Sequence, residues 1–317
     1  MKHLSIFLFF LLSRLLYAVD YDCAFIGTSP IPLLEAIYQS YLGKKVIIFE
    51  QAAECGGAWK SIEICGIPHV DMGCHDATWS DPSLSEFFEN YIGCKIVSFH
   101  SSTQPSSGPY WFSRGCYELI GNLCKMVAKT SIELRMNCRV LATVVENDAV
   151  VLSTQQETFS AKKIYVTPLS EFSINQQPVS QSKSKYYHLY LLISDPTPPK
   201  FTSKYLGNGV SRMMNLTHSA ELSETGRQLL VLQTYSEQEF YQGQRFIDLL
   251  KMMNLIGPSA YLLRAEAYVY EASYGCAKVH SLCPEYRSFF EVLNTGSLGG
   301  MSSYVKKWKE VLPLYQE

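Results

Sequence analysis

The first part of the chain combines short apolar runs with a segment of helical periodicity. An apolar run at residues 23–26 meets Gly27, and apolar residues then recur at helical spacing over residues 33–41. A second apolar run, residues 46–49, ends on Glu50. Short apolar runs next to turn signals are typical of buried strands, whereas apolar positions three and four apart indicate a helix. The pattern therefore predicts a strand, a tight turn, a helix and a second strand, which together form a βαβ unit.

The turn and the acidic residue of this unit are candidates for binding a dinucleotide. Gly27 lets the chain leave the first strand sharply. Thr28, Ser29 and Pro30 lead into a helix whose N-terminus offers free N–H groups and a positive dipole end to a pyrophosphate. Glu50, at the end of the second strand, is placed to accept hydrogen bonds from ribose hydroxyls.

The residues after Glu50 strengthen this interpretation. Glu50 is followed, after five residues, by Gly56-Gly57. This resembles the E-x5-G-G signature of the large FAD family that includes amine oxidases, protoporphyrinogen oxidases, carotenoid desaturases and UDP-galactopyranose mutases. In that family the Gly-Gly backbone passes close to FAD, where a side chain would collide. The resemblance implies that Gly56, Gly57, Ala58 and Trp59 lie near the cofactor; packing at a domain seam is the alternative for Trp59.

Residues 66–78 resemble the next block of the family. The family pattern of an apolar residue, Asp, an apolar residue, Gly, any residue and His reads here as Val70-Asp71-Met72-Gly73-Cys74-His75. The resemblance implies that Gly73 and His75 come back beside the flavin. His75 is therefore the candidate catalytic residue, able to orient a substrate or shuttle a proton. The alternative is an ordinary hydrogen-bonded, half-buried histidine.

Two later segments resemble further family blocks. Residues 131–168 match the third block, with Val140 where the family has an adenine-contacting valine. Residues 292–313 keep the shape of the C-terminal block, a short strand, glycines and an amphipathic helix. Thr295 and Gly296 stand near the position of the family's Gly-Asp, but the carboxylate that would bind the ribityl chain is missing.

The glycine fingerprint of the family is also altered. The family pattern is G-x-G-x-x-G, and the three glycine positions here hold Gly27, Ser29 and Pro32, with Pro30 in the expected place. Ser29 adds a side chain where the backbone approaches pyrophosphate. Pro32 fits the first turn of a helix but has no N–H to donate.

The resemblance, together with the order of the segments along the chain, implies the fold class and the domains. The chain has 317 residues, of which 47% are hydrophobic and 18% charged, with a net charge of −2, so nothing suggests a nucleic acid partner. We expect an α/β protein in which a Rossmann-type FAD-binding domain, three-layered with a mostly parallel sheet, carries a smaller strand-rich α+β substrate domain. The polar segment 171–185 is expected to be a linker. The expected order is a signal peptide (1–18), a first FAD-binding segment (19–80), a helical segment (81–130), a second FAD-binding segment (131–170), the substrate domain (171–285) and a C-terminal FAD-binding strand and helix (286–317).

The N-terminus has the features of a secretion signal. Lys2 precedes the apolar residues 4–12, and Ala18 provides a small residue at a cleavage point. We therefore expect an exported protein, periplasmic, secreted or in the secretory-pathway lumen, with no membrane contact beyond this signal. An uncleaved N-terminal membrane anchor is the alternative.

The ten cysteines permit disulfides in an exported protein. Cys23 lies in the first predicted strand and is expected to be a buried thiol. Cys276 and Cys283 lie in a loop-like segment and are the preferred pair.

Three functions agree with these patterns. The first is an exported FAD-dependent oxidoreductase that takes a hydride from a C–N or C–C bond of a small-molecule substrate, with an unidentified electron acceptor. The second is a degenerate relative that acts as a binding module, which Ser29 and Pro32 motivate. The third is a non-redox flavoenzyme of the UDP-galactopyranose mutase type. Arg114 is a candidate for binding an anionic substrate group, although a solvated helix-start arginine is the alternative.

Overall fold

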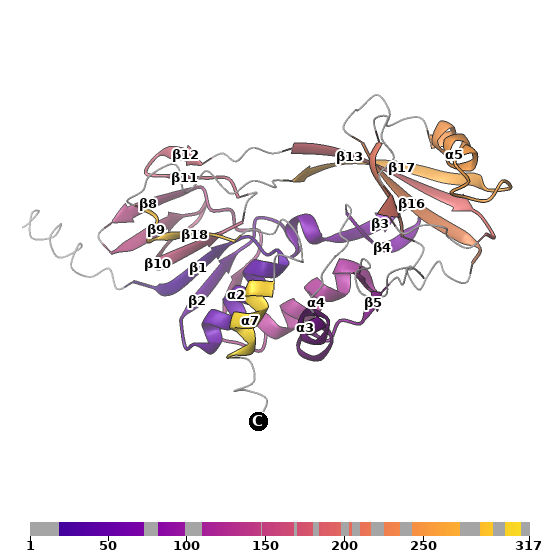
Figure 1. Cartoon of the computed structure of the whole chain (residues 1–317). Helices are drawn as coiled ribbons and strands as arrows, with labels where there is room; N and C mark the ends of the chain where they lie inside the picture. The colour runs from indigo at the N-terminus through magenta and orange to yellow at the C-terminus, as the bar shows by residue number, and fades with distance from the viewer. Residues whose placement is uncertain are drawn as a thin grey trace, which may run out of the picture.

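The computed structural model places two sheets at opposite ends of an elongated molecule (Figure 1). A nine-stranded sheet lies near the N-terminus of the described chain, and a five-stranded sheet lies at the far end. The structure describes residues 19–72, 82–98, 110–146, 148–167, 170–179, 184–197, 203–204, 210–216, 225–234, 243–272, 286–293 and 302–311.

The nine-stranded sheet has a parallel centre with an antiparallel extension. Its order is β12-β11-β8-β9-β10-β1-β2-β7, and β18 also pairs with β10. The pairs β10–β1, β1–β2, β2–β7 and β10–β18 are parallel, whereas β8–β9, β9–β10 and β11–β12 are antiparallel. The strands are β1 (Tyr21–Ile26), β2 (Val46–Phe49), β7 (Glu133–Arg135), β8 (Ala142–Glu146), β9 (Ala149–Ser153), β10 (Thr158–Val166), β11 (Phe172–Ile174), β12 (Gln177–Val179) and β18 (Phe290–Val292).

The first strand is apolar along its length because both of its faces are buried. Side chains of a strand alternate between faces. Cys23 and Phe25 accordingly pack with the helices, whereas Ala24 and Ile26 pack into the core on the other side of the sheet. Together with the antiparallel strands that close the second core, this gives the layered α/β arrangement that the sequence predicts.

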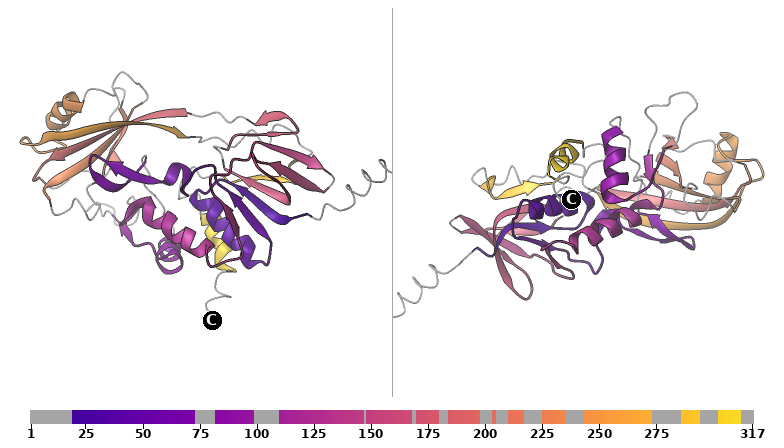
Figure 2. Two further views of the ribbon diagram at one scale, coloured as in Figure 1. Left: turned by 180° about the vertical axis from the view of Figure 1, so that it is seen from behind. Right: turned by 90° about the horizontal axis from the view of Figure 1, so that it is seen from below.

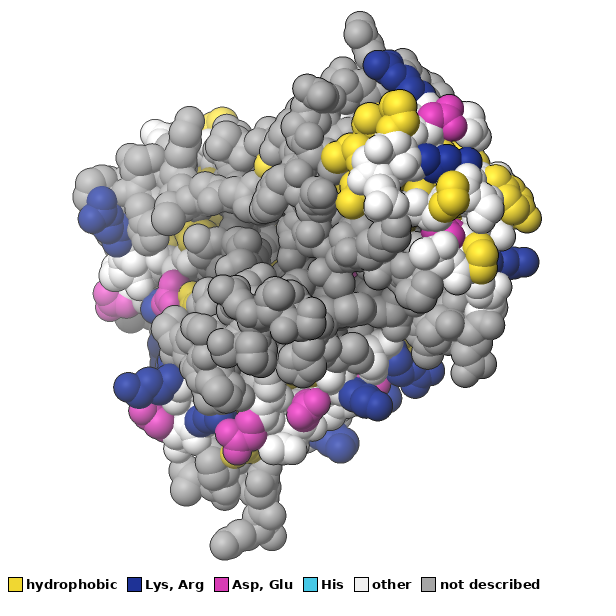
Figure 3. All heavy atoms as spheres, turned by 45° about the vertical axis from the view of Figure 1, so that its right-hand side comes forward, with side chains coloured by type: hydrophobic (Ala, Val, Ile, Leu, Met, Phe, Trp, Pro, Cys, Tyr) yellow, Lys and Arg dark blue, Asp and Glu magenta, His cyan; other side chains and the backbone are white. Residues whose placement is uncertain are grey.

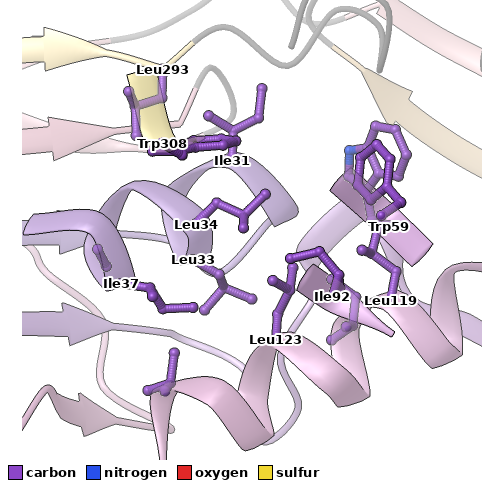
Figure 4. Packing of buried hydrophobic residues seen from close by; sticks show 14 of the residues in the cluster. Ile31, Leu33, Leu34, Ile37, Trp59, Ile92, Leu119, Leu123, Leu293 and Trp308 are labelled. Atoms are coloured by element: carbon purple, nitrogen blue, oxygen red, sulfur yellow. The ribbon is translucent and has the colours of Figure 1, made fainter. Parts of the chain in front are cut away.

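Helices cover one face of this sheet (Figure 2). They are α2 (Pro30–Tyr41), α4 (Gly115–Val127) and α7 (Ser302–Lys309). The close view in Figure 4 shows Leu33 and Leu34 of α2 beside Leu123 of α4, with Trp308 of α7 lying over Ile31. Next to α4, the short helix α3 (Pro82–Glu86) continues into a π-helical turn, η2 (Phe87–Ile92), and the hairpin β5 (Ile96–Ser98) and β6 (Tyr110–Phe112) follows.

A buried carboxylate holds the C-terminal helix α7 in place. The side chain of Glu35 in α2 is fully buried. Its oxygens accept hydrogen bonds from Lys307 Nζ at 2.6 Å, Trp308 Nε1 at 3.1 Å and Gln39 Nε2 at 2.6 Å. Among the described residues, three side chains thus supply the hydrogen bonds that a buried carboxylate requires.

The five-stranded sheet is antiparallel and is covered on both faces. Its order is β14-β15-β16-β13-β17. Helix α5 (Gly243–Met252) packs on one face, and the hairpin β3 (Ser61–Ile64) and β4 (Ile67–Asp71) packs on the other. Hydrophobic side chains are also exposed at this end of the molecule (Figure 3). The strands are β13 (Ser184–Ser194), β14 (Ser203–Lys204), β15 (Val210–Asn215), β16 (Arg227–Thr234) and β17 (Tyr261–Ala272).

The segment expected to be a linker contains two strands. The polar segment 171–185 is not a linker at its start, because β11 and β12 form a hairpin that extends the nine-stranded sheet to Val179. The nine-stranded sheet therefore continues past residue 170.

The N-terminal signal and some other predicted features lie outside the described residues. Residues 1–18 and the Cys276–Cys283 pair belong to this group. Within the portion of the chain that the structure describes, no helix has the length and apolar character needed to cross a bilayer. Cys23 is a buried free thiol, as predicted.

Candidate cofactor-binding site

The turn after β1 requires glycine for two reasons. Gly27 has φ +101°, a backbone conformation that other residues rarely adopt. A Cβ at this position would also lie 2.9 Å from Cγ2 of Thr167, the residue that follows β10. The Gly27 N–H donates to the carbonyl of Phe49 at 2.8 Å, which holds the turn against the end of β2. The turn therefore sits at the carboxyl ends of three neighbouring parallel strands, where ligands of such sheets bind.

A single hydroxyl joins the elements of the predicted motif. Thr28 is buried, and its Oγ1 donates to Oε2 of Glu50 at 2.5 Å and accepts from the N–H of Gly56 at 3.0 Å. The other Glu50 oxygen accepts from the N–H of Ala52 at 2.9 Å. Each carboxylate oxygen has two lone pairs, so Glu50 keeps acceptor capacity for a ligand hydroxyl. The sequence indicates Thr28 as a residue of the turn but gives no sign that it connects Glu50 to the Gly-Gly segment.

The N-terminus of α2 has an unusual donor set. Ser29 is the N-cap residue, Pro30 begins the helix, and the first helical hydrogen bond runs from the Leu33 N–H to the Ser29 carbonyl at 3.2 Å. Prolines carry no N–H, so Pro30 and Pro32 remove two of the amides that a helix N-terminus normally presents.

The Ser29 side chain stands out against this reduced set. It is 8% exposed, and its Oγ has no hydrogen-bond partner among the described residues. It does not cap its own helix. A buried hydroxyl without a hydrogen-bond partner is costly, so a ligand atom that bonded to the Ser29 Oγ would remove this cost. The Oγ also lies at the positive end of the helix dipole, which favours an anionic ligand.

The Gly56-Gly57 segment forms a tight turn next to α4. Gly56 and Gly57 have φ +111° and +55°, and they lead into a 3-10 turn, η1 (Gly57–Trp59). A Cβ on Gly56 would lie 3.3 Å from Cγ1 of Ile120 in α4, whereas one on Gly57 would meet no atom of the described residues within 4 Å. Gly56 is thus needed for packing as well as for its backbone angle, whereas no described atom would crowd a side chain at Gly57. Ala58 is half-buried beside it.

Trp59 belongs to the hydrophobic core. It is 7% exposed and packs in the same cluster as Ile92 and Leu119, the latter from α4 (Figure 4). Of the two interpretations of this aromatic residue, packing is the one that its contacts support.

Asp71 fixes the end of β4, just before the loop that is predicted to face the flavin. Its Oδ1 accepts from Ser61 Oγ at 2.6 Å and from the N–H of Cys116 at 2.8 Å, at the start of α4. Its carbonyl accepts from the Tyr190 hydroxyl at 3.1 Å. Asp71 therefore ties the end of β4 to α4 and to β13. Gly73 and His75, which come next, lie outside the described residues, as do Thr295 and Gly296.

The residues just before Val140 form backbone hydrogen bonds with the segment that begins at Glu50. The N–H groups of Asn137 and Cys138 donate to the carbonyls of Ala52 and Glu50, at 3.0 and 2.8 Å. Val140 itself is 3% exposed and packs in the core on the face away from the helices. Its contact with an adenine ring stays a prediction. Arg114 is the exposed N-cap of α4, in keeping with the solvated alternative.

Comparisons with known proteins identify the fold. Neither a protein-family model nor a curated protein matches the sequence. An Exiguobacterium protein described as a protoporphyrinogen oxidase has a TM-score of 0.64 at 10% identity, covering 94% of this chain and 99% of that chain. Putrescine oxidase bound to putrescine has a TM-score of 0.61 at 10% identity, covering 92% and 99%. Rab GDI from Plasmodium falciparum has a TM-score of 0.58 at 10% identity, covering 92% and 98%.

The chain therefore has the fold shared by these solved structures. This agrees with the fold that the sequence motifs imply. Because one fold can host different activities, function has to be argued from the site.

Proposed function

We propose that the chain is an FAD-dependent oxidoreductase of the amine oxidase type. Its substrate would be a small molecule that gives up a hydride from a C–N or C–C bond. FAD supplies the redox chemistry when bound, and the electrons pass on to oxygen or to another acceptor. The observation that carries this proposal is the buried hydroxyl of Ser29, which has no partner among the described residues and stands at the N-terminus of α2.

The residues of the turn fit the cofactor. In a FAD site of this type the pyrophosphate lies at the helix N-terminus. Pro30 and Pro32 offer it no N–H, but the Ser29 hydroxyl is a donor that the family's glycine lacks. The substitution thus replaces lost backbone donors with a side-chain donor.

Glu50 and the Gly-Gly turn complete the fit. Thr28 and the Ala52 N–H hold the Glu50 carboxylate in one orientation. Because the Glu50 side chain is already held in place, it can accept hydrogen bonds from ribose hydroxyls without a further loss of its own conformational entropy. Gly57, where an added Cβ would meet no described atom within 4 Å, allows the close approach of a cofactor. His75 would then act on the substrate, orienting it or moving a proton.

The first experiment is an absorbance spectrum of the purified full-length protein, before and after incubation with FAD and desalting. Retained flavin absorbance, which bleaches when a suitable amine or alkene is added, is the expected result. A well-folded protein that stays colourless contradicts the proposal and favours a degenerate relative that acts as a binding module. Turnover that requires reduced flavin without net substrate oxidation favours a mutase-type flavoenzyme.

A pair of serine variants tests the role of Ser29 directly. Ser29→Ala should weaken FAD binding about tenfold, or about 1.4 kcal/mol, which is the scale of a hydrogen bond to a charged group. Ser131→Ala changes an exposed serine in the same domain and should leave FAD affinity unchanged. Equal affinities for Ser29→Ala and wild type would remove Ser29 from the site.

We also propose that residues 1–18 direct export and are removed. The mass of the protein recovered from its native host tests this. A chain that begins near Val19 supports cleavage, and an intact N-terminus in the membrane fraction favours an anchor.

A further inference from the structure

Two half-buried thiols lie together beside the Gly56-Gly57 turn. Cys55 immediately precedes the turn, and Cys124 lies on α4. Ile120, whose Cγ1 would lie 3.3 Å from a Cβ on Gly56, is one helical turn before Cys124. Residues four apart share a helix face, so Cys124 is on the side of α4 that faces the turn. Both cysteines pack against the same hydrophobic cluster.

The two thiols interact with each other and have different acidities. A hydrogen bond with Cys55 lowers the pKa of the Cys124 thiol, and the same contact, together with burial, raises the pKa of Cys55. The directions of the two shifts agree with a hydrogen bond in which the Cys55 thiol is the donor and the Cys124 sulfur is the acceptor. Cys55 Sγ also lies 3.9 Å from Sδ of Met136, a soft, polarisable neighbour.

Other described cysteines have a different environment. Burial raises the pKa of Cys23 and Cys65 to about 11 and that of Cys94 to about 12. These three thiols are also more deeply buried than Cys55 and Cys124. Because the thiolate is the reactive form and must be accessible, Cys124 combines the conditions that a nucleophilic thiol needs.

We propose that Cys55 and Cys124 form a redox-active thiol pair that closes to a disulfide by exchange with a low-molecular-weight disulfide. The Cys124 thiolate attacks one sulfur of the small disulfide, so that a mixed disulfide forms and one thiolate leaves. Cys55 then loses its proton and attacks Cys124 Sγ, which releases the second thiolate. Two protein thiols are oxidised and the small disulfide is reduced to two thiols. One of the released thiolates takes the proton of Cys55, and the other takes from solvent the proton that Cys124 released when its thiolate formed.

The consequence is a covalent link between the Gly-Gly turn and α4. A disulfide between Cys55 and Cys124 would fix Gly56 against the helix that it already contacts. This inference does not depend on FAD, because it concerns only the two thiols and their immediate neighbours.

The test uses the full-length protein and oxidised glutathione as the probe. After incubation, the remaining thiols are alkylated, the protein is digested without reduction and the peptides are identified by mass spectrometry. We expect a cross-linked peptide pair that contains Cys55 and Cys124. In the reduced protein, peptide-resolved labelling across pH should show Cys124 alkylated at lower pH than Cys55.

Variants separate the two steps. Cys55→Ser should trap glutathione on Cys124 as a stable mixed disulfide, and Cys124→Ser should slow the first step at least tenfold. Cys138→Ser, which changes another half-buried thiol of the same domain, should leave the cross-link unchanged. If a variant does not fold, the wild-type peptide map and Cys138→Ser still decide the matter. Complete alkylation of both thiols after oxidant treatment, or a cross-link of either one to another cysteine, would overturn the proposal.

Discussion

The hydroxyl of Thr28 lies 2.5 Å from a carboxylate oxygen of Glu50, although the two residues belong to opposite ends of the βαβ unit. The same hydroxyl accepts a hydrogen bond from the N–H of Gly56. A local turn residue therefore sets the position of both the acidic residue and the Gly-Gly segment. The candidate site is built before any ligand arrives, which lowers the entropic cost of binding.

Thr28→Val keeps the shape of this side chain and removes its hydroxyl. We expect a loss of about 2 kcal/mol in the free energy of unfolding, because a buried carboxylate loses a donor and the Gly56 N–H loses its acceptor. Urea unfolding measures the change. Thr28→Ser keeps the hydroxyl and should recover most of the stability; equal losses in both variants would assign the effect to packing.

Gly27 and Gly43 offer a matched test of the first turn. Both have positive φ, but a Cβ on Gly27 would meet Thr167 at 2.9 Å, whereas one on Gly43 would meet no atom within 4 Å in the part of the chain that the structure describes. Gly43→Ala should cost about 1 kcal/mol from backbone strain alone. Gly27→Ala adds the clash, so thermal unfolding should show a clearly larger loss of stability. Similar melting temperatures for the two variants would contradict the close approach of Thr167.

Part of the fold could be predicted from the sequence, because its signals lie within short segments of the chain. The strand, turn, helix and acidic residue of the βαβ unit depend on periodicity and on Gly27, which short segments reveal. The sequence does not predict the hairpin of β11 and β12, because most residues of segment 171–185 are polar. It lies at the edge of the sheet, where Gln177 and Pro178 are exposed, and only alternate residues such as Phe172 and Ile174 are buried. Its turn residue Asn175 has a positive φ.

The partners of Glu35 could not be predicted for a different reason. Lys307 is 272 residues away along the chain. On a helix surface, Glu35 reads as an ordinary solvated acid. Only the docking of α7 on α2 buries it, and long-range contacts of this kind leave no periodic signal. The same limit applies to Cys55 and Cys124, whose separate sequence contexts give no indication that they meet.

Glu35→Gln tests whether this carboxylate holds α7. The Lys307 side chain is 39% exposed and stays solvated in the variant, but Trp308 Nε1 and Gln39 Nε2 donate to the two carboxylate oxygens, and glutamine keeps only one acceptor oxygen, so the change should cost about 2 kcal/mol in stability. Limited proteolysis should then release the C-terminal helix sooner than in wild type. Glu86→Gln is the control for the same helix, because its pair with Lys309 of α7 at 3.1 Å is exposed and worth less than about 1 kcal/mol. Unchanged cleavage of Glu35→Gln would show that hydrophobic packing of Trp308 suffices.

The hydrogen bond from the Tyr21 hydroxyl to Glu133 predicts a defined pH dependence. Burial, followed by this hydrogen bond, raises the pKa of Tyr21 from 10.0 to about 12, so its stabilisation is complete below pH 10 and is lost as the pH rises towards 12. The same hydrogen bond lowers the pKa of Glu133 below 4.5, so its stabilisation is present above that pH and is lost on acidification.

Tyr21→Phe should therefore cost about 1 kcal/mol at pH 7, which is the net scale of one hydrogen bond. The difference in unfolding free energy between wild type and variant should shrink below pH 4.5 and again between pH 10 and 12. Tyr261→Phe, at a tyrosine that is 57% exposed, should show no such difference at pH 7. Urea unfolding at several pH values gives the comparison. Because β1 and β7 lie on either side of β2, a flat difference across the whole pH range would mean that the link from Tyr21 to Glu133 does not stabilise this edge of the sheet.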